Sequence, residues 1–178
     1  MGPALVPVGK VLKLARPETP SLGFIKFNHC MMNAVMRNRS VPCDAVLPHV
    51  MYRDLEAAIA WLTKTLGFTE HYRYGEPASG AQIYLGSAYL MLKRAPPEAA
   101  TPAQLGYGTQ SLTIFVEDVA SHYQKAKAAG ARIVEEPHTT CYGEFQYAVV
   151  DIEGHHWLFS QHSSDVSPEE WGATVAPR

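Results

Sequence analysis

The chain's closing strand has the sequence Asp151-Ile152-Glu153-Gly154-His155-His156-Trp157-Leu158-Phe159-Ser160-Gln161-His162. An Asp-x-Glu-Gly turn leads into this aromatic, histidine-bearing strand. Gly154 suits the tight turn, because glycine adopts a positive φ without steric cost. His155 and His156 are adjacent, so their side chains are expected to point to opposite faces of the sheet. The residues that this strand carries and lacks distinguish a metal enzyme from a binding pocket without a metal.

The residues before this strand form one pattern of elements that occurs twice. In the first copy, Asp54 is suited to cap a helix whose apolar side chains recur at helical spacing up to Gly67. We expect strands around it over residues 46–53, 68–74, 82–85 and 88–93. In the second copy, Asp118 caps a helix that ends at Gly130. We expect strands there over residues 110–116, 131–135 and 145–151 before the closing strand, with a loop at 137–144.

The spacing of the helix signals indicates an internal repeat. The two capping aspartates are 64 residues apart, and the two terminating glycines are 63 apart. Each copy is therefore a βαβββ unit with one sheet face covered by its helix and the other left open. The predicted fold class is α+β, with two tandem βαβββ repeats forming an open-ended, cup-shaped mixed sheet and helices on its outer face. The cup is the expected binding site.

The chain divides into three parts on this interpretation. Residues 1–43 are basic and rich in proline, and we expect a poorly structured extension. Residues 44–162 form one domain, with repeat one at 44–94, a linker at 95–107 and repeat two at 108–162. Residues 163–178 form a tail, in which Ser167-Pro168-Glu169-Glu170 has the pattern of a capping box. We expect a short helix there, with Trp171 packed on the domain.

Composition limits the classes of function. A chain of 178 residues with 47% hydrophobic residues is typical of a globular protein, and no apolar run approaches the roughly 18–20 residues that span a bilayer. The net charge of −2 provides no excess of positive charge for binding nucleic acid or an anionic membrane. Cys30, Cys43 and Cys141 are scattered and odd in number, which argues against a disulfide framework. We therefore expect a cytoplasmic protein without nucleic-acid or membrane partners.

The repeated segments resemble a known superfamily. The resemblance rests on residues 53–62, Leu66-Gly67-Phe68, residues 116–119, Ala129-Gly130-Ala131 and residues 151–157. Together they resemble the vicinal oxygen chelate superfamily, which comprises glyoxalases, bleomycin-resistance proteins and extradiol dioxygenases, over about residues 45–162. The tail at 165–170 is similar to that of the bleomycin-resistance-like branch. The resemblance implies that a chain with only two repeats forms a homodimer with its site near the subunit boundary.

Metal enzymes of this superfamily carry His or Glu ligands at four positions. Carried over by register, these positions are occupied here by Leu47, Met91, Ser111 and Leu158. None supplies the nitrogen or carboxylate ligand that a divalent ion of this type needs. We therefore expect no metal and no cofactor, and the resemblance favours the branch that sequesters ligands, including antibiotics.

Eight residues form the predicted ligand-binding site, because they share the inner face of the inner strands of each repeat. They are His49, Met51, Tyr89, Met91, Ser111, Thr113, His156 and Leu158. This mixture of apolar, aromatic and a few polar groups suits a flat or partly aromatic organic molecule. His71, His122 and His138 are expected at the surface without a partner.

Three functions stay open from the sequence. The first is a small-molecule-binding protein of the glyoxalase and bleomycin-resistance type that sequesters an organic ligand without a metal. The second is a metal-dependent lyase, isomerase or dioxygenase in which His49 and His156 are non-standard ligands or act as acid and base. The third is a non-catalytic structural module whose cup is filled by its own side chains. Whether the protein is an enzyme is left open, with the balance against catalysis; no catalytic residue is assigned.

Overall fold

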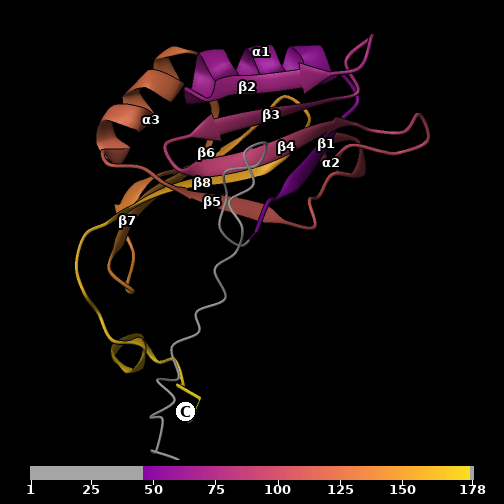
Figure 1. The fold of residues 1–178 in the computed structure, drawn as a ribbon. Helices are drawn as coiled ribbons and strands as arrows, with labels where there is room; N and C mark the ends of the chain where they lie inside the picture. The colour runs from indigo at the N-terminus through magenta and orange to yellow at the C-terminus, as the bar shows by residue number, and fades with distance from the viewer. Residues whose placement is uncertain (1–45, 177–178) are drawn as a thin grey trace, which may run out of the picture. The chain divides into compact units, whose positions relative to one another are not determined.

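The computed structural model describes residues 46–176 (Figure 1). The expected extension at residues 1–43 lies outside the described residues. The expected α+β fold of two tandem βαβββ repeats is confirmed within the described range. No helix between residues 46 and 176 is long and apolar enough to cross a membrane.

The first repeat has the predicted order of elements, although its first strand begins three residues later than expected. It consists of β1 (His49–Tyr52), α1 (Leu55–Leu66), β2 (Thr69–Tyr74), β3 (Gly80–Leu85) and β4 (Ala88–Arg94). The Asp54 carboxylate caps α1 by accepting a hydrogen bond from the Ala57 amide at 2.9 Å. Gly67 ends the helix with a φ of 73°, a left-handed conformation that favours glycine. Local signals therefore set both ends of α1.

The second repeat has the same order of elements. It consists of β5 (Ser111–Phe115), α3 (Val119–Ala128), β6 (Arg132–Thr139), β7 (Glu144–Val150) and β8 (His156–His162). Asp118 caps α3 through the Ser121 amide at 2.9 Å. The predicted loop at 137–144 is wrong in its first part, because β6 continues to Thr139. His138 pairs there with Gln146 of β7, so partners distant in the sequence recruit these residues into the sheet.

Two short helices flank the second repeat. The predicted linker contains α2 (Pro102–Leu105), in which Thr101 Oγ1 accepts from the Gln104 amide and Gln104 Oε1 accepts from the Thr101 amide. The tail contains the 3-10 helix η1 (Pro168–Trp171), at the position of the predicted terminal helix. The Trp171 ring is exposed and lies 6.0 Å from the Tyr142 ring, centroid to centroid.

The strands form two four-stranded mixed sheets. The first sheet has the order β1-β4-β3-β2 and the second the order β5-β8-β7-β6. β1 is parallel to β4, β5 is parallel to β8, and the other neighbours are antiparallel. β1 and β5 are therefore edge strands. Along β1 burial alternates, with Val50 and Tyr52 in the core and Met51 52% exposed, so one face of the sheet is covered and the other is open.

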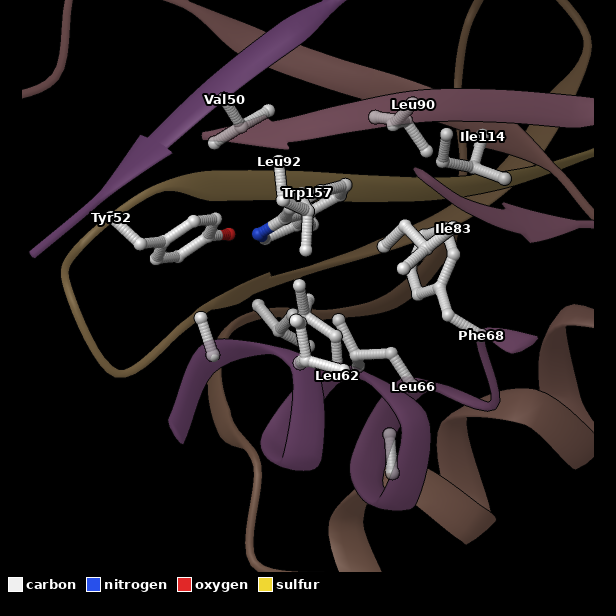
Figure 2. Packing of buried hydrophobic residues seen from close by; sticks show 14 of the residues in the cluster. Val50, Tyr52, Leu62, Leu66, Phe68, Ile83, Leu90, Leu92, Ile114 and Trp157 are labelled. Atoms are coloured by element: carbon white, nitrogen blue, oxygen red, sulfur yellow. The ribbon is translucent and has the colours of Figure 1, made fainter. Parts of the chain in front are cut away.

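A single apolar core joins the two repeats. Figure 2 shows Trp157 of β8 surrounded by side chains of the first repeat, including Leu62 and Leu92. The Phe68 and Trp157 rings meet edge-on at 5.5 Å, and α1 contacts α3. Because the helix-covered faces of both sheets contribute to this core, the opposite faces are left for other roles.

Candidate ligand-binding site

The turn between β7 and β8 fastens the second repeat to the first. Asp151 is only 6% exposed, and its Oδ2 accepts hydrogen bonds from Tyr52 Oη at 2.6 Å and Trp157 Nε1 at 3.0 Å. Its Oδ1 accepts from the backbone amides of Glu153 and His155. Burial, and then the nearby Asp151 carboxylate, raise the pKa of the Tyr52 phenol well above its usual value. The turn at residues 151–155 therefore anchors the second repeat to the first.

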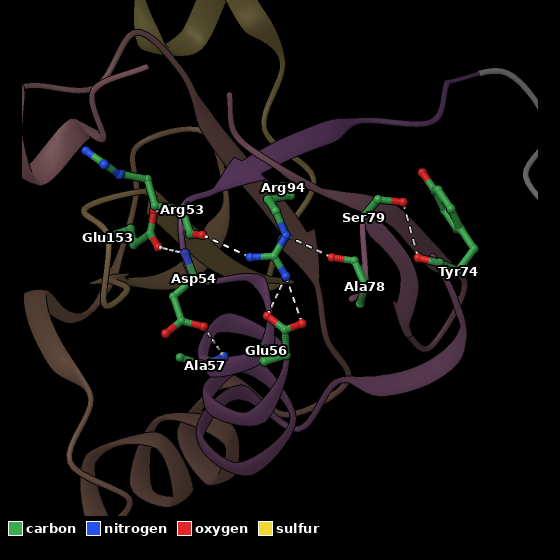
Figure 3. Close-up of polar contacts among 9 residues, drawn as sticks. All are labelled: Arg53, Asp54, Glu56, Ala57, Tyr74, Ala78, Ser79, Arg94 and Glu153. Atoms are coloured by element: carbon green, nitrogen blue, oxygen red, sulfur yellow. Dashed lines mark hydrogen bonds and ion pairs between the residues drawn. The ribbon is translucent and has the colours of Figure 1, made fainter. Parts of the chain in front are cut away.

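The same turn also holds the beginning of α1. The Glu153 carboxylate accepts from the amides of Arg53 and Asp54, each at 2.8 Å (Figure 3). On the other side of the helix terminus, the Arg94 guanidinium donates to Glu56 and to the Ala78 carbonyl oxygen. These contacts fix β1, and with it the direction in which His49 and Met51 point.

The open face of the first sheet is rich in aromatic side chains. We call it the aromatic face and define it by His49, Met51, His71, Tyr72, Gln82, Tyr84, Tyr89, Met91 and Lys93. The Tyr84 and Tyr89 rings are stacked, with centroids 5.2 Å apart and an interplanar angle of 22°. The His71 ring lies edge-on to both, at 6.3 and 6.0 Å. Stacked and edge-on rings of this kind form a platform for another planar ring.

A bulge in β2 places His71 on this face. The register between β2 and β3 shifts between Glu70 and Tyr72, so His71 is the extra residue. Its Nδ1 lies 2.7 Å from Gln82 Oε1. The Tyr72 hydroxyl, from the next residue, is directed at Met91 Sδ at 3.8 Å. Strict alternation would have put one of these two side chains on the opposite face. The expectation that His71 has no partner is therefore wrong.

The open face of the second sheet is polar. We call it the polar face because polar side chains outnumber apolar ones on it. Cross-strand register places on it Ser111, Thr113, Phe115, Arg132, Glu135, His138, Gln146, Ala148, Val150, His156, Leu158 and Ser160. Glu135 accepts from Gln146 Nε2 at 3.3 Å and lies 3.1 Å from His138 Nε2. His138 therefore also has a partner, contrary to the sequence-based expectation.

His122 is half-buried between the repeats rather than free at the surface. Its Nε2 lies 3.0 Å from the Leu66 carbonyl oxygen and its Nδ1 lies 2.6 Å from Tyr147 Oη. The carbonyl can only accept, so Nε2 carries the proton and Nδ1 accepts from the tyrosine. Burial lowers the pKa of His122. His122 thus serves as a neutral bridge between α3 and α1.

The eight predicted site residues divide equally between the two open faces. His49, Met51, Tyr89 and Met91 lie on the aromatic face, whereas Ser111, Thr113, His156 and Leu158 lie on the polar face. His49 and Met51 also line a cavity of about 300 Å³ together with His155 and residues of the linker. His156 lines a second cavity, of about 340 Å³, with Arg132 and Tyr107. The sequence analysis did not include four further residues of the aromatic face, namely His71, Tyr72, Gln82 and Tyr84.

The side chains at the positions predicted from the resemblance as metal ligands do not fit a divalent ion. Met91 belongs to the first sheet, and its sulfur already faces donors from Gln82 and Tyr72. Ser111 and Leu158 belong to the second sheet. Among residues 46–176, no group of three or more His, Cys, Asp or Glu is placed to hold a metal.

Comparison with known proteins establishes the family. A family model described as the Glyoxalase/Bleomycin resistance protein/Dioxygenase superfamily matches residues 26–159, and the chain belongs to this superfamily. A Mycobacterium bovis protein described as uncharacterized is 27% identical over 140 residues, covering 74% of this chain and 92% of the relative. The sequence-based resemblance is thereby confirmed.

Solved structures share the fold. TioX from Micromonospora sp. ML1 is 30% identical, with a TM-score of 0.55, and the match covers 66% of this chain and 99% of TioX. A bleomycin-binding protein, solved in complex with bleomycin, is 22% identical with a TM-score of 0.55, and the match covers 67% of this chain and 99% of that protein. At that identity the second likeness shows the fold alone.

Proposed function

We propose that this protein binds a small, planar aromatic molecule on the aromatic face of the first sheet and sequesters it without a metal. The observation that carries the proposal is the stacked pair Tyr84–Tyr89 with His71 edge-on to both rings. These rings lie on the sheet face opposite the one that packs against α1, beside the exposed side chains of His49 and Met51. A surface of this kind offers stacking area and few charges, as small-molecule sites commonly do.

Two further features support binding over a purely structural role. Met51 is 52% exposed, so the face is not closed by its own side chains at β1. The cavity of about 300 Å³ beside His49 adjoins the same edge strand. A bleomycin-binding protein shares the fold, and bleomycin therefore belongs in the test panel, although the ligand of this chain is proposed only by chemical class.

We propose that the working form is a homodimer in the cytoplasm. β1 and β5 are edge strands, and Met51 and Phe115 expose large apolar side chains along them. A second copy placed against these edges would bring an aromatic face opposite a polar face and complete a cup from the two halves of the predicted site. The exposed free thiol of Cys141 is compatible with a reducing compartment. Light scattering tests the dimer, and a monomer at working concentration would contradict it.

The test of the binding function is a thermal-shift and calorimetric screen with planar aromatic compounds, to which bleomycin is added because a protein of this fold binds it. A true ligand at a hundred times its Kd stabilises the protein by about 2.7 kcal/mol, which is a measurable rise in Tm. Tyr89→Ala removes one stacked ring, and we expect at least about five-fold weaker binding. Trp171→Ala, which removes an exposed aromatic ring in the tail, is the matched control and should bind normally. No shift with any compound would refute the function.

A further inference from the structure

The amide of Gln82 has only one orientation that satisfies both of its neighbours. Gln82 is fully buried, although it lies on the aromatic face. Its Nε2 donates to Met91 Sδ at 3.6 Å, and a thioether sulfur can only accept. Its Oε1 is therefore the atom that faces His71 Nδ1 at 2.7 Å. The backbone of the central strand β3 holds this amide in place, since Gln82 pairs with Met91 on one side and Tyr72 on the other.

This orientation determines which nitrogen of His71 carries the proton. The Gln82 amide oxygen can only accept, so His71 Nδ1 must donate. In a neutral imidazole the other nitrogen, Nε2, is then an unprotonated acceptor. Nε2 points away from Gln82 because it is on the far side of the ring. Among residues 46–176, no hydrogen-bond partner of His71 Nε2 is found.

The His71 ring lies among aromatic rings. The His71 centroid is 5.2 Å from that of Tyr72, 6.0 Å from that of Tyr89 and 6.3 Å from that of Tyr84. A planar molecule stacked on these rings would have its edge near His71 Nε2. A ligand without a donor hydrogen at that edge would cover the nitrogen and remove its contact with water without replacing it, which costs free energy.

We propose that His71 is a specificity-determining residue, which selects planar aromatic ligands that carry an N–H or O–H donor at the ring edge. Phenols and indoles belong to this class, and their O-methyl and N-methyl counterparts do not. Gln82 is the positioning residue, because it acts only by holding the His71 tautomer. This inference rests on the proposed binding function and states which chemistry that surface selects.

The test compares indole with 1-methylindole, which stack alike but differ in the donor. Binding to the full chain is measured by NMR titration at pH 8, where an imidazole is neutral. We expect indole to bind about three- to ten-fold more tightly, the effect of one hydrogen bond. His71→Phe should remove this preference while 1-methylindole still binds. Equal affinities for the two probes in the unaltered protein would overturn the role of His71 and leave the binding function standing, whereas binding of neither probe would overturn both.

A second measurement reports on the tautomer without any ligand. A long-range ¹H–¹⁵N spectrum of the imidazole side chains should show His71 with a protonated Nδ1 and an unprotonated Nε2. Gln82→Leu, which has similar volume and no acceptor, should shift His71 toward the opposite tautomer and reduce the preference for indole. A protonated Nε2 in the unaltered protein would refute the proposal even if aromatic compounds bind.

Discussion

Replacing Asp151 with alanine should strongly destabilise the junction of the repeats. The carboxylate is the acceptor for Tyr52 Oη and Trp157 Nε1, and both of these side chains are fully buried. Once the acceptor is gone, neither donor can reach water. A buried donor without a partner costs about 1–3 kcal/mol, so the two together cost about 2–6 kcal/mol. That is a large part of the stability of an ordinary domain.

The loss of stability should be smaller when only Oδ2 of Asp151 is replaced and Oδ1 is kept. Asp151→Asn keeps Oδ1 for the amides of Glu153 and His155 but places an NH₂ group before Tyr52 and Trp157. The Tyr52 hydroxyl can turn and accept, whereas the indole N–H can only donate. We therefore expect Asp151→Asn to cost about 1–3 kcal/mol, less than the alanine variant.

The assay is urea unfolding at pH 8 and fixed protein concentration, followed by circular dichroism. Asp165→Asn is the control, because its side chain is fully exposed in the tail and the change should stay within about 0.5 kcal/mol. The m-value should stay constant, so that a lower midpoint reports stability rather than a change in the unfolded state. A loss below about 1 kcal/mol for Asp151→Ala would refute the assignment of this carboxylate as the anchor.

Three further predictions concern other contacts. Glu153→Ala should cost about 1–3 kcal/mol in the same assay, because the amides of Arg53 and Asp54 lose their acceptor; an unchanged midpoint would contradict this. The lowered pKa of His122 means that its contribution to stability is complete above about pH 6.5 and is lost as the pH falls through the folded value. In His122→Phe the free energy of unfolding should therefore fall less steeply as the pH is lowered below about 6.5. An equally steep fall would show that His122 does not cause this pH dependence. Hydrogen bonds to Glu144, and then to Asp165, raise the pKa of His162, so its support of the tail is complete below about pH 6.5 and is lost as the pH rises through the folded value. NMR titration should show a lower His162 pKa in Asp165→Asn, and an identical titration curve would count against the contact.

Much of the fold could be predicted because its signals are local. Asp54, Gly67 and the apolar side chains between them define α1 without reference to any other part of the chain. The same kinds of signal around Asp118 predicted α3. The nearly constant spacing between the signals of the two helices predicted the internal repeat. Helix α2 also had a local signal, the capping box in Thr101-Pro102-Ala103-Gln104. It was not predicted, because residues 95–107 were interpreted as a linker without a helix.

The course of β6 and the partners of the histidines could not be predicted in the same way. β6 continues through Pro137 to Thr139 because β7 supplies hydrogen-bond partners, and that pairing depends on the register between distant segments. His71 reaches Gln82 through a bulge that breaks the alternation of β2. His122 meets the end of α1 only after the two repeats have packed together.

The sequence by itself determined the class of fold, the ends of the principal helices and which strand residues share a face, because periodicity and capping act over a few residues. The resemblance also led to the prediction that the usual metal positions lack ligands. Only the tertiary structure decided that the eight predicted site residues divide between an aromatic and a polar face, that His71 and Gln82 belong to the candidate site, and that Asp151 anchors one repeat to the other. The physical reason is that these contacts join residues from different strands or repeats, and their geometry follows from sheet register and from the packing of one shared core.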